Sequence, residues 1–269
     1  MKVFISSDIE GSCGITHWDE TDYDRGGRWY DYFRLQMTKE AAGAARGALS
    51  AGACAVRIKD AHDSARNIIP SELPRDERVS VHRGWSGSPF SMVAGLEEGF
   101  DALAFTGYHS PSHDSGNPLS HTMSTSVYEL RLNGERASEF TIHSYIAAML
   151  SIPVIFLSGD EALCEKARGF VPGIQTVSAS RGVGNSSTSM HPDEAVSRIE
   201  STMSKAVASG GKDCLISLPE SFSASVKYVH HWQAFRSSFY PGASLADERT
   251  VAFETRDYME MLRFFHFTL

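Results

Sequence analysis

The stretch Ser6-Ser7-Asp8-Ile9-Glu10-Gly11 follows directly on an apolar run, Val3-Phe4-Ile5. Such a run is typical of an inner strand of a sheet, and residues two apart at the tip of a strand project to the same side. The carboxylates of Asp8 and Glu10 are therefore expected to converge. Two converging anions repel each other unless they share a proton or bind a cation, so the pair predicts a divalent metal site or raised pKa values. Taken alone, the motif also fits a helix N-cap followed by an exposed acid.

The composition is that of an ordinary globular protein. The 269 residues are 42% hydrophobic and 22% charged, enough for one large or two modest domains with a full core. A formal charge of -8 without a Lys/Arg-rich run argues against nucleic acid and membranes as partners. The four cysteines are widely spaced and lack a C-x-x-C motif, so they indicate neither a disulfide framework nor a thiolate zinc site. The N-terminus lacks a signal-peptide pattern, and a cytoplasmic location fits best.

Predicted strands and helices alternate along the first two thirds of the chain. Further strands are predicted over residues 55–58, 79–81, 102–106 and 154–157, and helices over 30–51, 90–98 and 160–170. The polar segment 11–27 is predicted to be a long loop over the end of the first strand. Alternation of this kind is typical of an α/β fold with a mostly parallel sheet and flanking helices.

Titratable residues follow three of these strands. Asp8 and Glu10 follow the first strand, Asp60 and His62 the second, and His109 the strand at 102–106. Because ligands collect at the carboxyl ends of parallel strands, we expect these side chains to share one edge of the sheet. His62 and His109 also fit as ordinary hydrogen-bonded loop histidines.

A fifth candidate ligand lies at the start of a helix predicted after Ser138. Glu139 occupies its first turn, where the helix dipole also stabilises an acid, and His143 lies one turn later on the same face. Together with Asp8, Glu10, His62 and His109 this makes five oxygen and imidazole groups. That number suits two divalent ions, of which zinc is the first choice, with one bridging carboxylate and water at the open positions.

The character of the sequence changes after residue 172. Strands are predicted near 174–179, 214–218, 224–228 and 250–254, helices over 193–208, 231–238 and 257–267, and a Gly/Ser-rich loop over 182–189. An earlier alternating segment, 127–132, is followed by Asn133-Gly134 and predicts a β-hairpin. We expect an α/β metal-binding catalytic domain over 1–180 and a smaller C-terminal α+β domain over 181–269, with the boundary between about 175 and 210.

Several ordered motifs resemble the zinc-dependent D-aminopeptidases associated with dipeptide-transport operons. The N-terminal motifs are Asp8-x-Glu10-Gly11, Asp60-x-His62, Gly107-Tyr108-His109, Ser120-His121-x-Met123 and the helix start at Glu139. The similarity continues through Tyr240-Pro241-Gly242 and Phe253-Glu254-x-x-Asp257. It therefore covers nearly the whole chain.

The resemblance implies a set of roles. It implies two zinc ions per chain, held by Asp8, Glu10, His62, His109 and Glu139, with Asp8 as the bridge. It makes His121 the catalytic histidine, and it places Asp60 and His143 beside the ligands or the substrate. It also implies a homo-oligomer, a ring-shaped decamer whose active sites face an inner channel.

The function predicted from these motifs is a metallo-aminopeptidase. It would remove the N-terminal residue, a D-amino acid such as D-Ala, from short peptides with the help of a zinc-activated water. One alternative is a metallophosphoesterase, which needs a cationic pocket, but only Arg57, Lys59 and Arg66 lie near the motifs. Another is a non-catalytic peptide-binding accessory protein, in which the metal would have a closed set of ligands.

Overall fold

The computed structural model describes residues 1–24 and 29–269 and contains two sheets. The larger sheet has the strand order β3-β2-β1-β4-β7-β8-β9. All neighbouring strands in it are parallel except β8 and β9. Its strands are β1 (Lys2–Ser7), β2 (Ala55–Asp60), β3 (Val79–His82), β4 (Ala102–Tyr108), β7 (Val154–Asp160), β8 (Gln175–Val183) and β9 (Ser186–Ser189). The predicted α/β fold with a mostly parallel sheet is confirmed.

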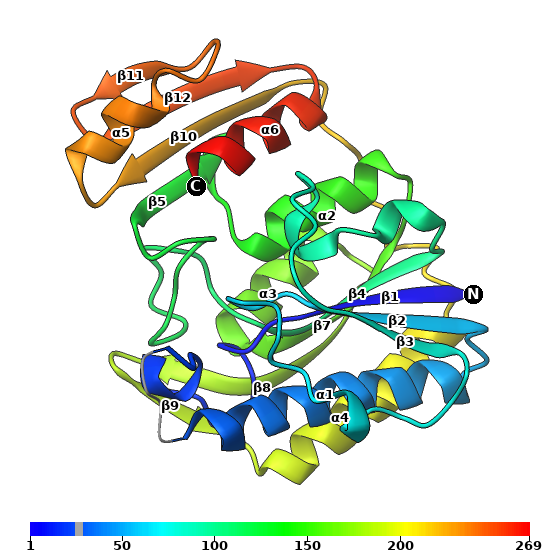
Figure 1. Ribbon diagram of the computed structural model, residues 1–269. Helices are drawn as coiled ribbons and strands as arrows, with labels where there is room; N and C mark the ends of the chain where they lie inside the picture. The colour runs from blue at the N-terminus through cyan, green and yellow to red at the C-terminus, as the bar shows by residue number, and fades with distance from the viewer. Residues whose placement is uncertain (25–28) are drawn as a thin grey trace.

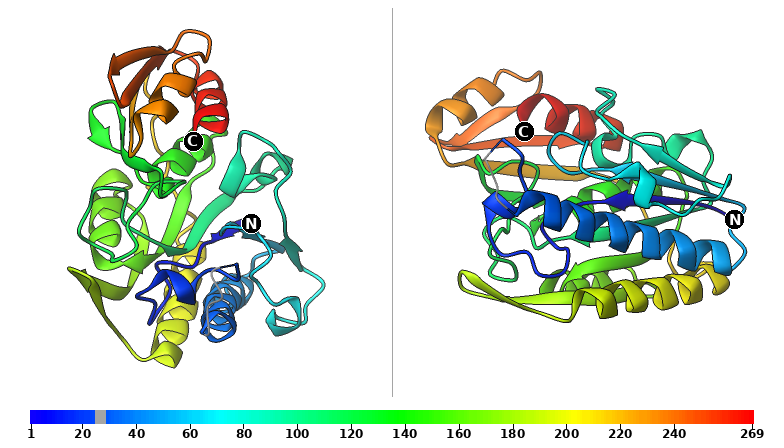
Figure 2. Two further views of the ribbon diagram at one scale, coloured as in Figure 1. Left: turned by 60° about the vertical axis from the view of Figure 1, so that its left-hand side comes forward. Right: turned by 60° about the horizontal axis from the view of Figure 1, so that its bottom comes forward.

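The central strands are apolar because helices cover both faces of the sheet. Every residue of β4 and β7 is buried, as expected for parallel strands shielded on both sides. The helices are α1 (Tyr30–Ser50), α2 (Glu139–Met149), α3 (Glu161–Phe170) and α4 (Pro192–Ala208). Figures 1 and 2 show α1 and α4 side by side against one face, with α2 and α3 on the opposite face.

The smaller sheet is antiparallel and has the order β11-β12-β10-β5-β6. Its strands are β5 (Val127–Leu132), β6 (Glu135–Arg136), β10 (Phe222–Tyr228), β11 (Ser244–Asp247) and β12 (Thr250–Thr255). Two helices accompany it, α5 (His231–Ser237) and α6 (Tyr258–Thr268). Helix α6 also contacts α2, so α2 lies between the two sheets (Figure 1). The predicted hairpin at 127–132 is present as β5 and β6.

The two sheets interleave along the sequence. β5 and β6 precede β7 in the chain but pair in the smaller sheet, whereas β9 and α4 pack with the larger one. The cause is the long-range pairing of β5 with β10, in which Ala224 lies opposite Leu132. A division into domains at residue 180 remains a prediction.

Three local predictions were wrong. Residues 90–98 form two short 3₁₀ helices, Ser91–Val93 and Leu96–Glu98, because Gly95 between them has a φ of 100°. The Gly/Ser-rich segment 182–189 is mostly strand, since the end of β8 pairs with β9. The segment 214–218 is not a strand; the carbonyl of Cys214 accepts one hydrogen bond from the amide of Val154, and the chain then leaves the sheet.

The predicted loop over the first strand is largely irregular, with one 3₁₀ helix at Trp18–Glu20, and its residues 25–27 lie outside the described part. The four cysteines are free, as their spacing predicted. Within the described residues, no helix has the length and apolar character needed to span a membrane.

Candidate metal centre

The predicted ligands gather where three adjacent strands end. β2, β1 and β4 are neighbours, and Asp8, Glu10, His62 and His109 lie within three residues of their carboxyl ends. The chain beyond β1 stays close to β4, because the amide of Asp8 donates to the carbonyl of Thr106 at 2.8 Å. Gly107 has a φ of 70°, and a Cβ there would lie 2.1 Å from the carbonyl oxygen of Asp8. Only glycine allows this close approach.

Asp8 lies between two groups of ligands. Its Oδ1 lies 3.3 Å from His62 Nδ1, and the same nitrogen lies 3.1 Å from Glu10 Oε2. Its Oδ2 lies 3.5 Å from His109 Nε2, which in turn lies 3.5 Å from Glu139 Oε2. The two oxygens of one carboxylate thus face two different histidines.

His121 lies slightly farther from the carboxylates. Its Nε2 lies 3.7 Å from Glu139 Oε1 and 4.0 Å from Glu10 Oε1. Its ring stacks on that of His109, with centroids 4.2 Å apart, and the edge of Trp18 packs against it. His109, His121 and Glu139 also lie close enough together to hold an ion, so distance alone allows His121 as a ligand.

The hydrogen bonds of the three imidazoles select their tautomers. His109 Nδ1 bonds to the carbonyl of Ser110 at 2.9 Å, and His62 Nε2 to that of Thr21 at 2.8 Å. His121 Nδ1 bonds to the carbonyl of Leu119 at 2.9 Å. A carbonyl accepts only, so these nitrogens carry hydrogen. The opposite nitrogen of each ring faces the carboxylates, the arrangement found in metal-binding histidines.

The unsatisfied atoms of the cluster fit the binding of divalent metal. Among the described residues, Asp8 Oδ2, Glu10 Oε2 and His109 Nε2 are buried without a hydrogen-bond partner. Leaving such groups buried is costly unless something else binds them. Ligands about 2.0–2.1 Å from a tetrahedral zinc ion lie about 3.3 Å from one another, and the separations of 3.1 to 3.5 Å around Asp8 are close to this value.

The electrostatics of the cluster also call for a cation. Burial raises the pKa of Asp8 well above its usual value, and the negative charge of Glu10 adds to the effect. Burial lowers the pKa of His109, but the neighbouring carboxylates of Glu139, Glu10 and Asp8 together outweigh burial and raise the pKa to about 10. Without a metal ion, protonated histidines would have to neutralise the carboxylates; a divalent ion serves the same purpose.

Asp60 and His143 lie behind the ligands. The carboxylate of Asp60 accepts hydrogen bonds from the amides of Asn67 and Ile68 at 2.6 and 2.7 Å. The side chain of Asn67 donates to the carbonyl of His62 at 2.6 Å, so Asp60 orders the loop that carries this ligand. His143 Nδ1 donates to the carbonyl of Glu139 at 2.7 Å, and burial lowers the pKa of His143 to about 4.

The centre is reached from a cavity of about 220 Å³. Glu10, His62 and His121 line it together with Trp18 and Met123. Neither Lys nor Arg lines this cavity in the described part of the chain. Two of the three cations considered from sequence have other partners: Lys59 donates to the carbonyls of Asp60 and Gly84, and Arg57 pairs with Glu98 at 2.5 Å. The third, Arg66, does not line the cavity.

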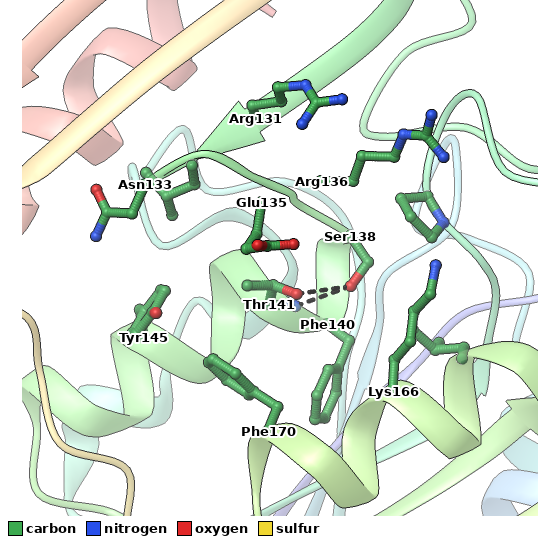
Figure 3. A pocket seen from close by; sticks show the side chains of 13 residues that line it. Arg131, Asn133, Glu135, Arg136, Ser138, Phe140, Thr141, Tyr145, Lys166 and Phe170 are labelled. Carbon is green, nitrogen blue, oxygen red and sulfur yellow. Dashed lines mark hydrogen bonds between the residues drawn. The ribbon is translucent and has the colours of Figure 1, made fainter.

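A larger cavity, of about 480 Å³, is lined by cations, among them Arg131, Arg136 and Lys166 (Figure 3). Arg131 and Arg136 line it, yet both pair with Glu129, at 3.0 and 2.8 Å. Lys166 pairs with Asp114. This cavity shares no lining residue with the one above the metal ligands, so its cations do not serve that centre.

Sequence reasoning missed the main-chain partners of the ligands. The amide of Met123 donates to Glu139 Oε1 at 2.6 Å, and the carbonyl of Thr21 fixes His62. The side-chain amide of Asn117 donates to the carbonyl of Glu10 at 3.0 Å. Of these residues, only Met123 could have been found from the sequence, because it belongs to the Ser120-His121-x-Met123 motif.

Fold and site together define a hydrolase-like α/β protein with a buried carboxylate and histidine centre, and comparisons with known proteins give the family. Residues 1–267 match the peptidase family described as D-aminopeptidase. The chain therefore belongs to the D-aminopeptidase family, which confirms the resemblance seen in its motifs and the predicted aminopeptidase class.

A sequence comparison and a structure comparison agree with this assignment. The chain is similar to a D-aminopeptidase of Bacillus subtilis (strain 168), with 27% identity over 97% of this chain and 93% of the relative. Its fold is similar to the solved structure of the Zn-dependent D-aminopeptidase DppA from Bacillus subtilis, a self-compartmentalizing protease. That comparison has a TM-score of 0.90 and 25% identity, and it covers 100% of this chain and 96% of that one.

Proposed function

We propose that this protein is a dinuclear zinc aminopeptidase that releases an N-terminal D-residue, such as D-Ala, from short peptides. The observation that carries the proposal is the position of Asp8, whose two oxygens face His62 and His109 separately, at 3.3 and 3.5 Å. One ion would be held by Asp8, Glu10 and His62, and the other by Asp8, His109 and Glu139. Zinc in such a site supplies a Lewis acid for the peptide carbonyl and lowers the pKa of water.

His121 is proposed as the residue that moves protons. Its Nδ1 is committed to the carbonyl of Leu119, so Nε2 is the nitrogen that faces the cavity and the carboxylates. Burial and the neighbouring His109 lower the pKa of His121, which keeps it neutral at pH 7. Neutral Nε2 can accept a proton from the attacking water and return it to the leaving amine.

The alternatives from sequence have less support. A phosphoesterase would need cations at the substrate, and no described Lys or Arg lines the cavity at the centre. A purely structural metal site would have a closed set of ligands, whereas a cavity of about 220 Å³ opens onto Glu10, His62 and His121. We keep the cytoplasmic location as a prediction.

We further propose that the protein is a homo-oligomer, a ring-shaped decamer. The similar DppA is a self-compartmentalizing protease, and enclosure would limit substrates to short peptides. Exposed aromatic side chains on and after α5 also favour contact between copies. Trp232, Phe235 and Phe239 are 53%, 58% and 73% exposed, and such apolar clusters often mark interfaces.

The test combines metal analysis with hydrolysis assays. We expect two zinc ions per chain after reconstitution. We also expect the protein to release the first residue from D-aminoacyl dipeptides, and a chelator to abolish this activity. Less than one ion per chain would contradict the dinuclear site. Faster cleavage of matched L-peptides would contradict the D-specificity.

His121→Asn tests the catalytic role separately. We expect a loss of about 10²–10⁴-fold in kcat with two ions still bound. Loss of an ion from this variant would make His121 a ligand instead. His113→Asn is the control, because His113 lies in the same loop, outside the cluster, and its φ of 62° suits asparagine.

A further inference from the structure

A side cavity of about 180 Å³ lies next to the cavity of about 220 Å³ at the metal centre, and Met123 lines both. The walls of this side cavity come from four parts of the chain, near residues 89–91, 123, 142–143 and 262–269. They include Met123, Ile142, His143, Leu262, Phe265 and Leu269. Helix α6 and Leu269 thus form one side of a space that lies next to the cavity at the metal centre, with Met123 between the two.

The backbone at Met123 is held in an unusual conformation. The amide of Ser124 donates to the carbonyl of Thr122 at 2.7 Å, which makes a γ-turn around Met123 with a φ of 62°. The same turn directs the amide of Met123 to Glu139 Oε1 at 2.6 Å. A non-glycine residue with positive φ is strained, and strain of this kind gathers at functional sites. Ser91, which also lines the side cavity, has a φ of 45°.

The side cavity suits an uncharged side chain. Six of the nine lining residues are apolar, and His143, one of the three polar ones, has its Nδ1 committed to the carbonyl of Glu139. An apolar cavity of about 150 Å³ can hold a benzene molecule, so about 180 Å³ admits a leucyl or phenylalanyl side chain.

We propose that this cavity is the specificity pocket for the side chain of the amino-terminal residue, and that Met123 is the partition between it and the metal centre. The inference deepens the proposed aminopeptidase function and depends on it. The amino-terminal residue is the part that fits, because the space holds a single side chain. The remaining peptide would extend into the other cavity, which Trp18 and Thr125 line.

Leu269 gives the sharpest test because it lines the pocket at the side formed by α6 and is only partly buried. We compare kcat/KM for a D-phenylalanyl and a D-alanyl peptide that are otherwise identical. Leu269→Trp fills the pocket and should lower the ratio of the two values, phenylalanyl to alanyl, about tenfold or more. Leu269→Ala enlarges the pocket and should leave that ratio equal or higher.

Arg263→Trp is the matched control, because it adds the same side chain at an exposed position of α6 that does not line the cavity. The ratio should not change in this variant. Met123→Ala removes the partition and should raise the ratio. Zinc content and circular dichroism check that each variant is folded; if Leu269→Trp is not, the Leu269→Ala and Met123→Ala results decide.

The outcomes separate the two proposals. If the wild-type protein cleaves neither peptide, the proposed function fails. If it cleaves them, but the ratio changes equally in Leu269→Trp and Arg263→Trp, or in none of the variants, the pocket is wrong while the aminopeptidase function stands.

Discussion

At the scale of single residues, the site depends on carboxylates that would be unfavourable without a cation. Asp8, Glu10 and Glu139 are almost fully buried, and burying an ionised carboxylate is costly unless it is paired. The histidines around them hold their hydrogens on the outer nitrogens. The centre is therefore arranged for metal before the metal arrives.

The proposed role of Asp8 as a bridge between two ions gives a prediction about metal content. Asp8→Asn should lower bound zinc from two ions to less than one per chain, since both sites lose a charged ligand, whereas Glu10→Gln should leave about one. Elemental analysis after reconstitution measures this. Asp63→Asn is the control: Asp63 is exposed at the same cavity, and its φ of 43° suits asparagine. Equal losses from Asp8→Asn and Glu10→Gln would rule out the bridge.

Glu40 gives a prediction about pH. Burial raises the pKa of Glu40 from 4.5 to about 7, although the amide of Cys13 and the side chain of Gln36 donate to Oε1. The folded state therefore holds this proton more tightly than the unfolded state. Its contribution to stability is present at low pH and falls as pH rises from about 4.5 to about 7, by up to about 3 kcal/mol.

Glu40→Gln removes this titration. The free energy of unfolding of the variant, relative to the wild type, should rise between pH 5 and pH 8. Urea unfolding at a series of pH values, with the same zinc concentration throughout, measures the difference. Metal binding affects both proteins alike, so a difference that is independent of pH would contradict the raised pKa.

At the scale of elements, the contact between α1 and α4 depends on glycine. A Cβ on Gly47 would lie 2.2 Å from the carbonyl oxygen of Glu200 in α4. Because the overlapping atom of Glu200 belongs to the backbone, it cannot rotate away as a flexible side chain can. The two helices would therefore have to move apart. By contrast, a Cβ on Gly169 in α3 would have no atom within 4 Å.

The two glycines should respond in opposite directions. Gly47→Ala should destabilise the protein by about 1–3 kcal/mol, since the overlap outweighs the better helix propensity of alanine. Gly169→Ala should stabilise it by up to about 1 kcal/mol. Denaturant unfolding of both variants provides the comparison. A stabilised Gly47→Ala protein would mean that α1 and α4 are less closely packed.

At the scale of the whole molecule, the exposed aromatic residues of α5 bear on assembly. Native mass spectrometry should give a mass ten times the 29.5 kDa of the chain. Phe235→Glu together with Phe239→Glu should shift it to smaller species, because charge cannot be buried at an apolar contact. Val183→Glu is the control, an exposed apolar position on the larger sheet. An unchanged mass in the double variant would exclude this face from the interface.

Local sequence patterns predicted the alternation of strands and helices in the first two thirds of the chain and the positions of the candidate ligands. Apolar runs such as 102–106 are long enough to mark buried strands, and parallel strands bring their carboxyl ends to one edge. The predicted convergence of Asp8, His62 and His109 follows from these local patterns. Glu139 could also be predicted as a candidate ligand, because the start of a helix has recognisable sequence signals.

The pairing of the strands and the surroundings of the candidate ligands could not be predicted from local sequence, because both depend on contacts between distant segments. β9 lacks an apolar alternation and is a strand because β8 offers it backbone partners, whereas 214–218 has a strand-like pattern but does not pair. The hairpin of β5 and β6 joined the smaller sheet through β10, more than eighty residues away in sequence. Met123 lies between two cavities because the γ-turn and the hydrogen bond from its amide to Glu139 hold it there. Local sequence sets the preference of each segment, but hydrogen bonds and packing between distant segments decide the outcome.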